Sequence, residues 1–368
     1  MIPDNDFSKA TIWVAFFIFF IIIGTAASEN PSAEIKSLWV VRYSMVSKKE
    51  IDRVIETAVE YGFNHLFVQV RGRGDAYYSS QIVPRGHYLS DPDFDPLAYA
   101  IEKGHSEGLQ VHAWLNTFLV WSSPEMPSDS NHVIRTHPEW IDEPGHQTGS
   151  DIHYGNGNDG IPRFLSPAVE GVIDHLKKIL VEILDHYPVD GIHLDYVRLA
   201  DLDYGFHPDA QGHFEEAYSI RPFDIKNGDN EEIRYLRSEW ERLRRESVTD
   251  FLRQYSQVIM EKKPDCLLSV AVKPDPSVAK YRYFQEWDEW LTEGLVDYVV
   301  PMNYATEMDD FQSNLQSIER TVQGKYNRSI IIGVAIYNQS PEAAAEKLKI
   351  LSTRDFAGFS VFSWDALK

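Results

Sequence analysis

The residues best placed to do chemistry stand at 190–198, in the segment Asp-Gly-Ile-His-Leu-Asp-Tyr-Val-Arg. Asp195 ends a short run with alternating apolar residues, and Arg198 follows it closely. A carboxylate that neighbouring cations keep ionised can act as a nucleophile or stabilise an oxocarbenium ion. The alternative is a purely structural ion pair between Asp195 and Arg198 or Arg71.

Other polar side chains stand where further short apolar runs end. Side chains of a strand alternate between two faces, so His112, Trp114 and Asn116 share one face, and His193 shares a face with Asp195. The same alternation places further polar or aromatic residues at the ends of other runs: Arg42, Gln69, Arg71, Lys273, Asn303, Tyr304, Tyr337, Trp364 and Asp365. Branched apolar side chains normally fill a barrel, so polar groups gathered at one end predict a site there.

The elements that must position these residues follow a regular order. Eight candidate strands are found at 38–41, 66–70, 109–115, 191–195, 267–272, 296–302, 330–334 and 358–362. Amphipathic, helix-length stretches separate them, near 50–59, 96–105, 167–183, 236–255, 287–293, 311–322 and 341–351. This alternation predicts an α/β fold, a single (β/α)8 TIM-type barrel. An open doubly wound sheet is the alternative, but its Gly-rich phosphate turn is missing after the first run.

The connections after the third and fourth strands are long, and residues 116–162 show little periodicity. In a barrel such insertions lie at the C-terminal face of the strands, where they wall a substrate cleft. Nothing in the sequence separates a second domain, so we expect one barrel over residues 28–368.

The N-terminal segment has the features of an export signal. An apolar run at 11–23 is shorter than the ~20 residues that a membrane helix needs, and small residues including Thr25 and Ala27 follow it. This arrangement is typical of a cleaved signal peptide over residues 1–27. An uncleaved anchor is the alternative, and only then would the chain be held at a membrane. Either way we expect a secreted or periplasmic protein of the cell envelope.

The amino-acid composition excludes several classes of binding partner and site. With 35 Lys and Arg against 56 Asp and Glu, the 368-residue chain has a formal charge of −21, which argues against binding nucleic acid or an anionic membrane surface. The single cysteine, Cys266, excludes an internal disulfide and a cysteine-based zinc site. The histidines show no compact metal-ligand spacing, so we expect no metal and no cofactor.

Four segments together resemble the bacterial glycosyl hydrolase-like family 10, a group of envelope-associated, glycosidase-like barrels. They are VQVRGRGDAYY at 68–78, VHAWLN at 111–116 with THPEW at 136–140, the segment 190–198, and GLVDYVVPMNY at 294–304. The resemblance covers roughly residues 35–368. It implies a TIM-type barrel, export, and hydrolysis of a glycan, for which peptidoglycan strands are a plausible substrate. The family's strand-four aspartate corresponds to Asp195.

The same strand is also similar to the family 18 chitinase motif, with two departures. His193 replaces the middle aspartate, and Val197 stands where the acid glutamate belongs. A glycosidase normally uses a second carboxyl that protonates the leaving group. Glu307 is our first choice because it follows Asn303 and Tyr304, but other strand-end acids are open alternatives: Asp275, Asp309 and Asp365.

The sequence thus favours an exported glycoside hydrolase with Asp195 and Glu307 as catalytic residues. Sugar hydroxyls would be bound by a set of strand-end residues: Arg42, Arg71, His112, Trp114, Asn116, His193, Tyr196, Arg198, Asn303 and Tyr304. Since the second carboxyl is not fixed and a fold does not guarantee activity, the alternative is a non-catalytic glycan-binding protein on the same barrel.

Overall fold

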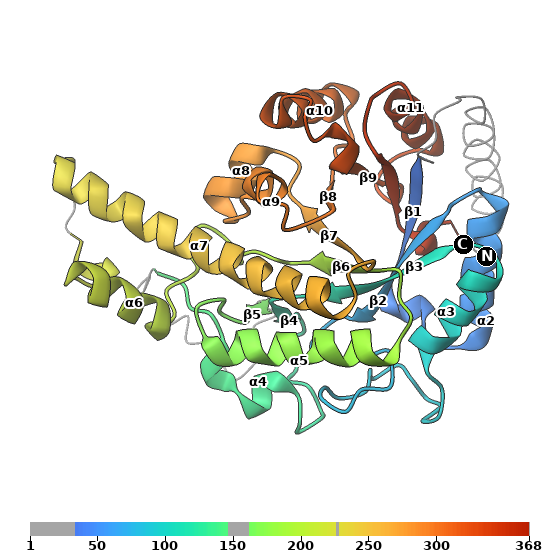
Figure 1. Cartoon of the computed structure of the whole chain (residues 1–368), viewed down its shortest axis with the longest axis horizontal. Helices are drawn as coiled ribbons and strands as arrows, with labels where there is room; N and C mark the ends of the chain where they lie inside the picture. Colours follow the sequence, from blue (N-terminus) through green and yellow to red (C-terminus); the bar gives the residue numbers. More distant parts are fainter. Residues whose placement is uncertain (1–33, 146–161, 226–227, 368) are drawn as a thin grey trace, which may run out of the picture.

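A computed structural model describes residues 34–145, 162–225 and 228–367 (Figure 1). The predicted export signal at 1–27 lies outside these residues. Within them, no helix is both long and apolar enough to span a bilayer.

The core of the molecule is a ring of eight parallel strands, as the sequence predicts. Hydrogen bonding joins them in the order β8-β7-β6-β3-β2-β1-β10-β9, and parallel bridges from Val299 to Ile330 and from Met302 to Gly333 link the two ends. The strands are β1 (Ile35–Val40), β2 (His65–Arg71), β3 (Gln110–Asn116), β6 (Gly191–Asp195), β7 (Leu267–Val272), β8 (Tyr298–Pro301), β9 (Ile331–Ala335) and β10 (Gly358–Phe362). The (β/α)8 barrel is therefore confirmed.

Helices cover the outside of this ring (Figure 1). Several begin at the capping residues that the sequence indicates: the side chains of Ser47, Asp95 and Ser340 each accept a hydrogen bond from a backbone N–H of the first helical turn. The helices of the ring are α2 (Lys48–Glu60), α3 (Pro96–Ser106), α5 (Glu170–His186), α7 (Glu231–Lys262), α8 (Pro276–Arg282), α9 (Trp287–Thr292), α10 (Met308–Val322) and α11 (Pro341–Leu351).

The strands carry two different kinds of buried side chain. Residues such as Leu38, Val40 and Val111 belong to the large apolar layer between strands and helices. The opposite strand faces supply a smaller cluster inside the ring, which includes Trp39, Phe67 and Trp114. The barrel interior is thus unusually rich in aromatic side chains for a fold normally filled by branched aliphatic ones.

Both long connections contain more structure than the sequence indicated. After β3, strand β4 (Leu119–Trp121) pairs with β5 (Arg163–Phe164), and helix α4 (Val133–Thr136) lies between them in the chain. After β6, helix α6 (Pro208–Tyr218) precedes α7, which begins at Glu231 rather than near residue 236.

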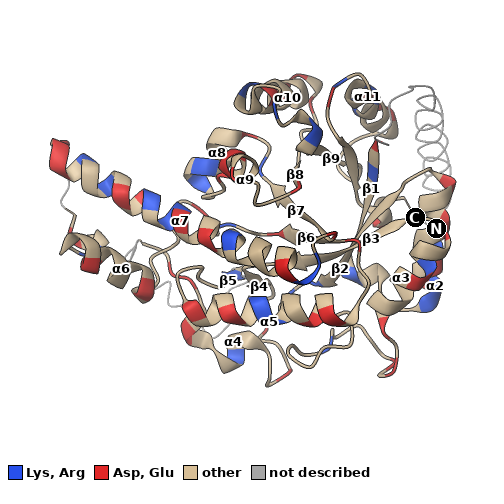
Figure 2. Cartoon of the chain, viewed as in Figure 1, with Lys and Arg blue, Asp and Glu red and all other residues tan. Residues whose placement is uncertain are grey.

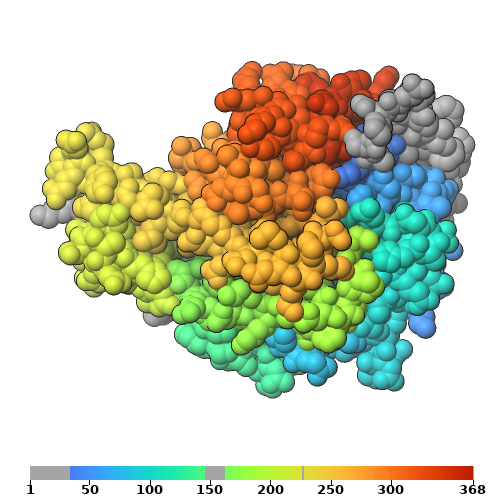
Figure 3. All heavy atoms as spheres, viewed as in Figure 1, coloured from blue at the N-terminus to red at the C-terminus, as the bar shows by residue number. Residues whose placement is uncertain are grey.

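Helix α6 and the first part of α7 project beyond the barrel as a lobe (Figures 1 and 3). Ala210, Phe214 and Trp240 form a separate apolar cluster between these two helices. Along α7 basic and acidic side chains alternate (Figure 2), and Arg253 pairs with Glu246, Asp250 and Glu293. The mixed charges keep the exposed faces of this long helix in solvent.

Candidate functional site

A cleft of about 330 Å³ opens at the carboxyl ends of the barrel strands. The predicted site residues Arg42, Trp114, Asn116, Asp195, Tyr196 and Tyr304 all line it. The strand ends and their loops also contribute Trp39, Val41, Tyr43, Gln69, Gly72, Arg73, Leu119, Ser122, Ala271, Met302, Tyr337 and Phe362. A cavity therefore lies at the end of the barrel where the sequence predicts a site.

Asp195 lies at the last position of β6, and it is the one carboxylate among the described residues that line the cleft. Its Oδ1 accepts a hydrogen bond of 2.6 Å from the backbone N–H of Tyr196. Tyr196 adopts a left-handed backbone conformation with φ of 56°, which is costly for a residue with a side chain. This strained turn brings the N–H back onto the carboxylate.

Burial raises the pKa of Asp195 to about 6, although the Tyr196 N–H and the charges of Arg198 and Lys273 oppose that rise. The carboxylate in turn raises the pKa of Tyr196 to about 12. Burial, followed by the charge of Asp195, also raises the pKa of Tyr304 well above its ordinary value. Near neutral pH the cleft therefore holds an anion flanked by protonated tyrosine hydroxyls.

Aromatic rings form the floor and one wall of the cleft. Phe362 lies at the centre, with ring centroids 5.8 Å from Trp39, 6.4 Å from Trp114, 5.6 Å from Tyr304 and 5.9 Å from Tyr337. Aromatic faces with polar edges suit the apolar faces of sugar rings. Trp39 and Phe362 are not among the predicted site residues because neither is a polar residue at the end of a strand, although Trp39 stands between the outward-facing Leu38 and Val40.

A chain of hydrogen-bonded polar side chains forms another part of the cleft wall. Arg42 donates from Nη1 to Oε1 of Gln69 over 3.1 Å, Gln69 donates to Oδ1 of Asn116, and Asn116 donates to the carbonyl of Gly72 over 2.7 Å. A Cβ on Gly72 would stand 2.5 Å from Cδ of Arg42, so this glycine makes room for the arginine. The wall therefore holds its groups in fixed positions.

His112 and His193 do not line the cleft but lie deeper, inside the ring. The ring of His193 stacks on Phe67 with centroids 4.1 Å apart, and His112 Nε2 lies 2.9 Å from Nδ1 of His65. Burial lowers the pKa of His193 to about 3. Both side chains face inward as expected, but they are buried in the interior and do not line the cleft.

Two further predicted residues, Arg71 and Asn303, also fall outside the cleft. Arg71 is buried behind it and donates to the carbonyls of Asn116 and Thr117. The pairing of β2 with β3 shifts between Gln69 and Arg71, so simple alternation fails at Arg71. Asn303 joins β8 to α10 through the carbonyl of Phe311.

Glu307, the first choice for the second carboxyl, is exposed at the N-cap of α10 and is not among the cleft residues. The alternatives Asp275, Asp309 and Asp365 do not line the cleft either. Neither Glu307 nor any of the three alternative acids therefore lines the cleft with Asp195.

Arg198 lines a second cavity of about 370 Å³ that adjoins the cleft. The two cavities share Leu119, Ser122 and Tyr196. The Arg198 guanidinium lies 5.2 Å from the ring centroid of Phe164 and 5.0 Å from that of Tyr196. The cleft thus continues past Tyr196 into a second aromatic compartment.

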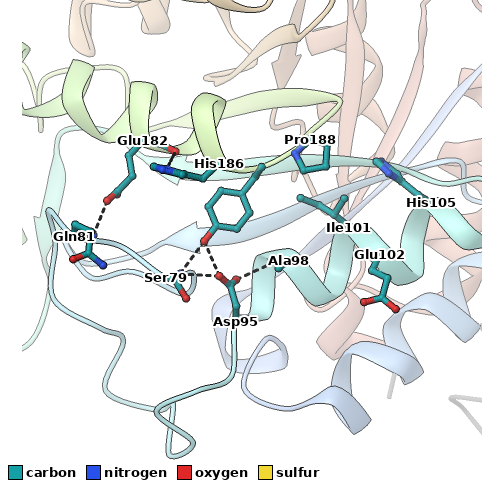
Figure 4. Close-up of a pocket in the computed structure, with 11 residues that line it drawn as sticks. Ser79, Gln81, Asp95, Ala98, Ile101, Glu102, His105, Glu182, His186 and Pro188 are labelled. Atoms are coloured by element: carbon teal, nitrogen blue, oxygen red, sulfur yellow. Dashed lines mark hydrogen bonds between the residues drawn. The ribbon is translucent and has the colours of Figure 1, made fainter.

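A larger cavity of about 570 Å³ lies away from the strand ends, between α3 and α5 (Figure 4). Two of its carboxylates, Glu182 and Asp95, are held by the protein itself. Glu182 accepts from Tyr78, Ser80 and the Gln81 N–H, and Asp95 accepts from Tyr187. These hydrogen bonds connect the loop after β2 to the helices, so the two carboxylates have a structural role.

In the part of the chain that the structure describes, no cluster of His, Cys, Asp or Glu could hold a metal ion.

Comparisons with known proteins identify the family of the chain. The family model "Glycosyl hydrolase-like 10" matches residues 34–347. Among curated proteins, Glycosyl hydrolase YngK of Bacillus subtilis is 23% identical over 78% of this chain and 59% of its own length. Glycosyl hydrolase DigH of Escherichia coli K12 is 26% identical over 66% of this chain and 55% of its own length. The chain thus spans less than two thirds of these relatives.

Solved structures show the same fold. The PgaB (BpsB) glycoside hydrolase domain from Bordetella bronchiseptica matches 91% of this chain and 95% of its own, with a TM-score of 0.69 at 14% identity. An α-L-fucosidase from Paenibacillus thiaminolyticus matches 83% of this chain and 41% of its own, with a TM-score of 0.57 at 14% identity. Because the family model matches most of its length, the chain belongs to the glycosyl hydrolase-like family 10.

Proposed function

We propose that this protein hydrolyses glycosidic bonds and that Asp195 is its catalytic carboxylate. One observation carries the proposal: Asp195 stands at the tip of a barrel strand, inside an aromatic cleft, with a pKa raised to about 6. Catalytic groups of such barrels come from the C-terminal ends of strands. Carboxyls with shifted pKa values concentrate at active sites because ordinary surface carboxyls lack the burial that produces the shift.

In the proposed reaction the bond between the anomeric carbon and the leaving oxygen breaks. The ionised Asp195 attacks that carbon or stabilises the positive charge that develops on it. Water supplies a hydroxyl to the anomeric carbon and a proton to the leaving oxygen. Tyr337, whose ring is exposed at the cleft, would contact the sugar ring, while Tyr196 and Tyr304 would bind its hydroxyls.

We infer that the substrate is a polysaccharide outside the cytoplasm, and peptidoglycan strands are the first to test. Support comes from the family match and from relatives named as glycosyl hydrolases. The adjoining cavity beyond Tyr196 supports a substrate longer than one sugar, because it continues the cleft. The signal-like segment at 1–27 supports export.

The test is the release of reducing ends from peptidoglycan strands that have been stripped of their peptides. Wild type should release them, and Asp195→Asn, which keeps the shape of the side chain but cannot ionise, should not. Binding of the strands by wild type without any release would instead favour the second candidate, a non-catalytic glycan-binding protein. That candidate is favoured by one observation: Asp195 is the lone carboxylate among the described cleft residues.

A further inference from the structure

The cleft carries positive charge that contrasts with the acidic protein around it. The whole chain has a formal charge of −21, but the described cleft residues include Arg42 and Arg73 beside the single carboxylate of Asp195. Lys273 and Arg198 are also close enough to lower the pKa of that carboxylate. An excess of cations at a ligand cleft in an acidic protein needs a reason other than solubility.

Arg42 is buried although it has no carboxylate partner. Its side chain is only 9% exposed, and it donates to the neutral oxygens of Gln69 and Tyr43, over 3.1 and 2.7 Å. The guanidinium also stacks on the Tyr43 ring, 4.5 Å from its centroid. Burying a charge is costly unless an opposite charge accompanies it. Within the described residues no such charge pairs with Arg42, and the space beside Gly72 is kept open for it.

Arg73 repeats the pattern on the same wall. Its guanidinium lies over the Trp121 ring, 5.8 Å from the centroid, and its Nε is buried with no hydrogen-bond partner in the described structure. The nearby carboxylate of Asp75 accepts from the backbone N–H of Arg73 instead of pairing with the side chain. Two guanidinium groups therefore face one cleft with donor capacity that the protein itself leaves unused.

We infer that Arg42 and Arg73 form a subsite for an oxyanion substituent of the glycan, so that the substrate class is an acidic polysaccharide. The planar, forked donors of arginine match a carboxylate or a sulfate ester. The bound oxyanion would supply the counter-charge that Arg42 lacks, while the exposed ring of Tyr337 contacts the sugar ring. This inference rests on the proposed function for the identity of the ligand as a glycan, but not on turnover.

The experiment measures binding by calorimetry in the Asp195→Asn protein, so that no substrate is consumed. The probes are peptide-free peptidoglycan strands, whose lactyl groups carry free carboxylates, and the neutral chitohexaose. A third probe, 6-O-sulfated chitohexaose, distinguishes a carboxylate from a sulfate ester as the preferred group. An acidic probe should bind roughly tenfold or more tightly than chitohexaose, and added salt should reduce this preference.

Arg42→Gln and Arg73→Gln should each reduce the preference for the acidic probe severalfold, whereas Arg42→Lys, which keeps the charge, should retain part of it. Arg320→Gln, at an exposed site on α10, is the matched control and should change nothing. Unchanged thermal unfolding would show that the variants are folded. Equal affinity for the acidic and neutral probes, no binding of any probe, or a preference that survives both Gln substitutions would overturn the inference.

Failure of the proposed function can be distinguished from failure of the subsite inference. If wild type releases no reducing ends but the Arg42 and Arg73 variants lose the preference for acidic probes, the oxyanion subsite is supported and the proposed hydrolysis is not. If wild type hydrolyses neutral and acidic strands equally well and binds them equally, the proposed hydrolysis is supported and the oxyanion subsite is refuted.

Discussion

The indole nitrogen of Trp39 donates a hydrogen bond of 3.0 Å to Nε2 of His193, while Nδ1 of His193 lies 2.9 Å from the hydroxyl of Ser269. Because Nε2 must accept from the indole, the proton of the neutral imidazole belongs on Nδ1. Burial lowers the pKa of His193 to about 3, so this arrangement persists at ordinary pH. A histidine inside the barrel thus orients a tryptophan at the floor of the cleft.

Replacing His193 tests this orientation. His193→Phe keeps the stacked ring beside Phe67 but leaves the Trp39 indole N–H without an acceptor. We expect a loss of about 1–3 kcal/mol in the free energy of unfolding, measured with denaturant. His193→Gln, which can present an oxygen to the indole, should lose less. A Phe variant as stable as wild type would contradict the assigned role.

Gly72→Ala should impair substrate binding through Arg42. The new Cβ would stand 2.5 Å from Cδ and 2.8 Å from Nε of Arg42, so the guanidinium must leave its place. We expect KM to rise severalfold with little change in thermal stability. Gly212→Ala in α6, where an added Cβ meets no atom within 4 Å, is the matched control. Equal KM values in the two variants would mean that the position of Arg42 is unimportant.

Asp195→Asn should stabilise the protein at neutral pH while it removes activity. The pKa of Asp195 is raised to about 6 in the folded state, so the folded protein binds this proton more tightly than the unfolded chain does. The stability that this group contributes is therefore lost as pH rises between the unfolded and the folded pKa. Above pH 6 the cost is roughly 2–3 kcal/mol.

Asparagine cannot ionise, so the variant should unfold at higher denaturant concentration than wild type at pH 7.5, with little gain near pH 4. Asp265→Asn, at an exposed position, serves as the control. A gain of the same size at both pH values would show that the effect does not come from the charge of Asp195.

Glu307→Gln should leave the rate of hydrolysis within about twofold of wild type. The side chain is exposed at the start of α10 and lies outside the cleft, although its place in the sequence after Asn303 and Tyr304 favours it as the acid. The measurement is kcat/KM for reducing-end release on the same strands. A loss of a hundredfold or more would return Glu307 to the mechanism and would require the loop after β8 to move.

Strand order, helix caps and the end of the barrel that holds the cleft could all be predicted, because they depend on local alternation and on the geometry of parallel crossovers. Asp195 was placed correctly at the tip of β6 for the same reason. The depth at which a side chain lies inside the barrel could not be predicted in this way, because alternation gives only the face of the strand. His193 faces the same side as Asp195 but lies below the cleft floor, where Trp39 and Phe67 enclose it.

Arg71 and Glu307 show two other limits of the sequence. The register shift in β2 that accompanies the burial of Arg71 depends on pairing with β3, which no local pattern records. The direction of a loop acid such as Glu307 depends on how α10 packs, and Asn303 fixes that packing through Phe311 and Asn314 rather than facing a sugar. Tertiary contacts decide both cases.

The most direct test of the central claim is the rate of reducing-end release from peptide-free strands between pH 4 and 8, for wild type and Asp195→Asn. If the ionised Asp195 is the catalytic group, the wild-type rate should rise about tenfold per pH unit at low pH and level off above about 6, in line with its pKa. The variant should be slower by on the order of a thousandfold. Equal rates in the two proteins, or a wild-type rate that falls as pH rises through 6, would contradict the account.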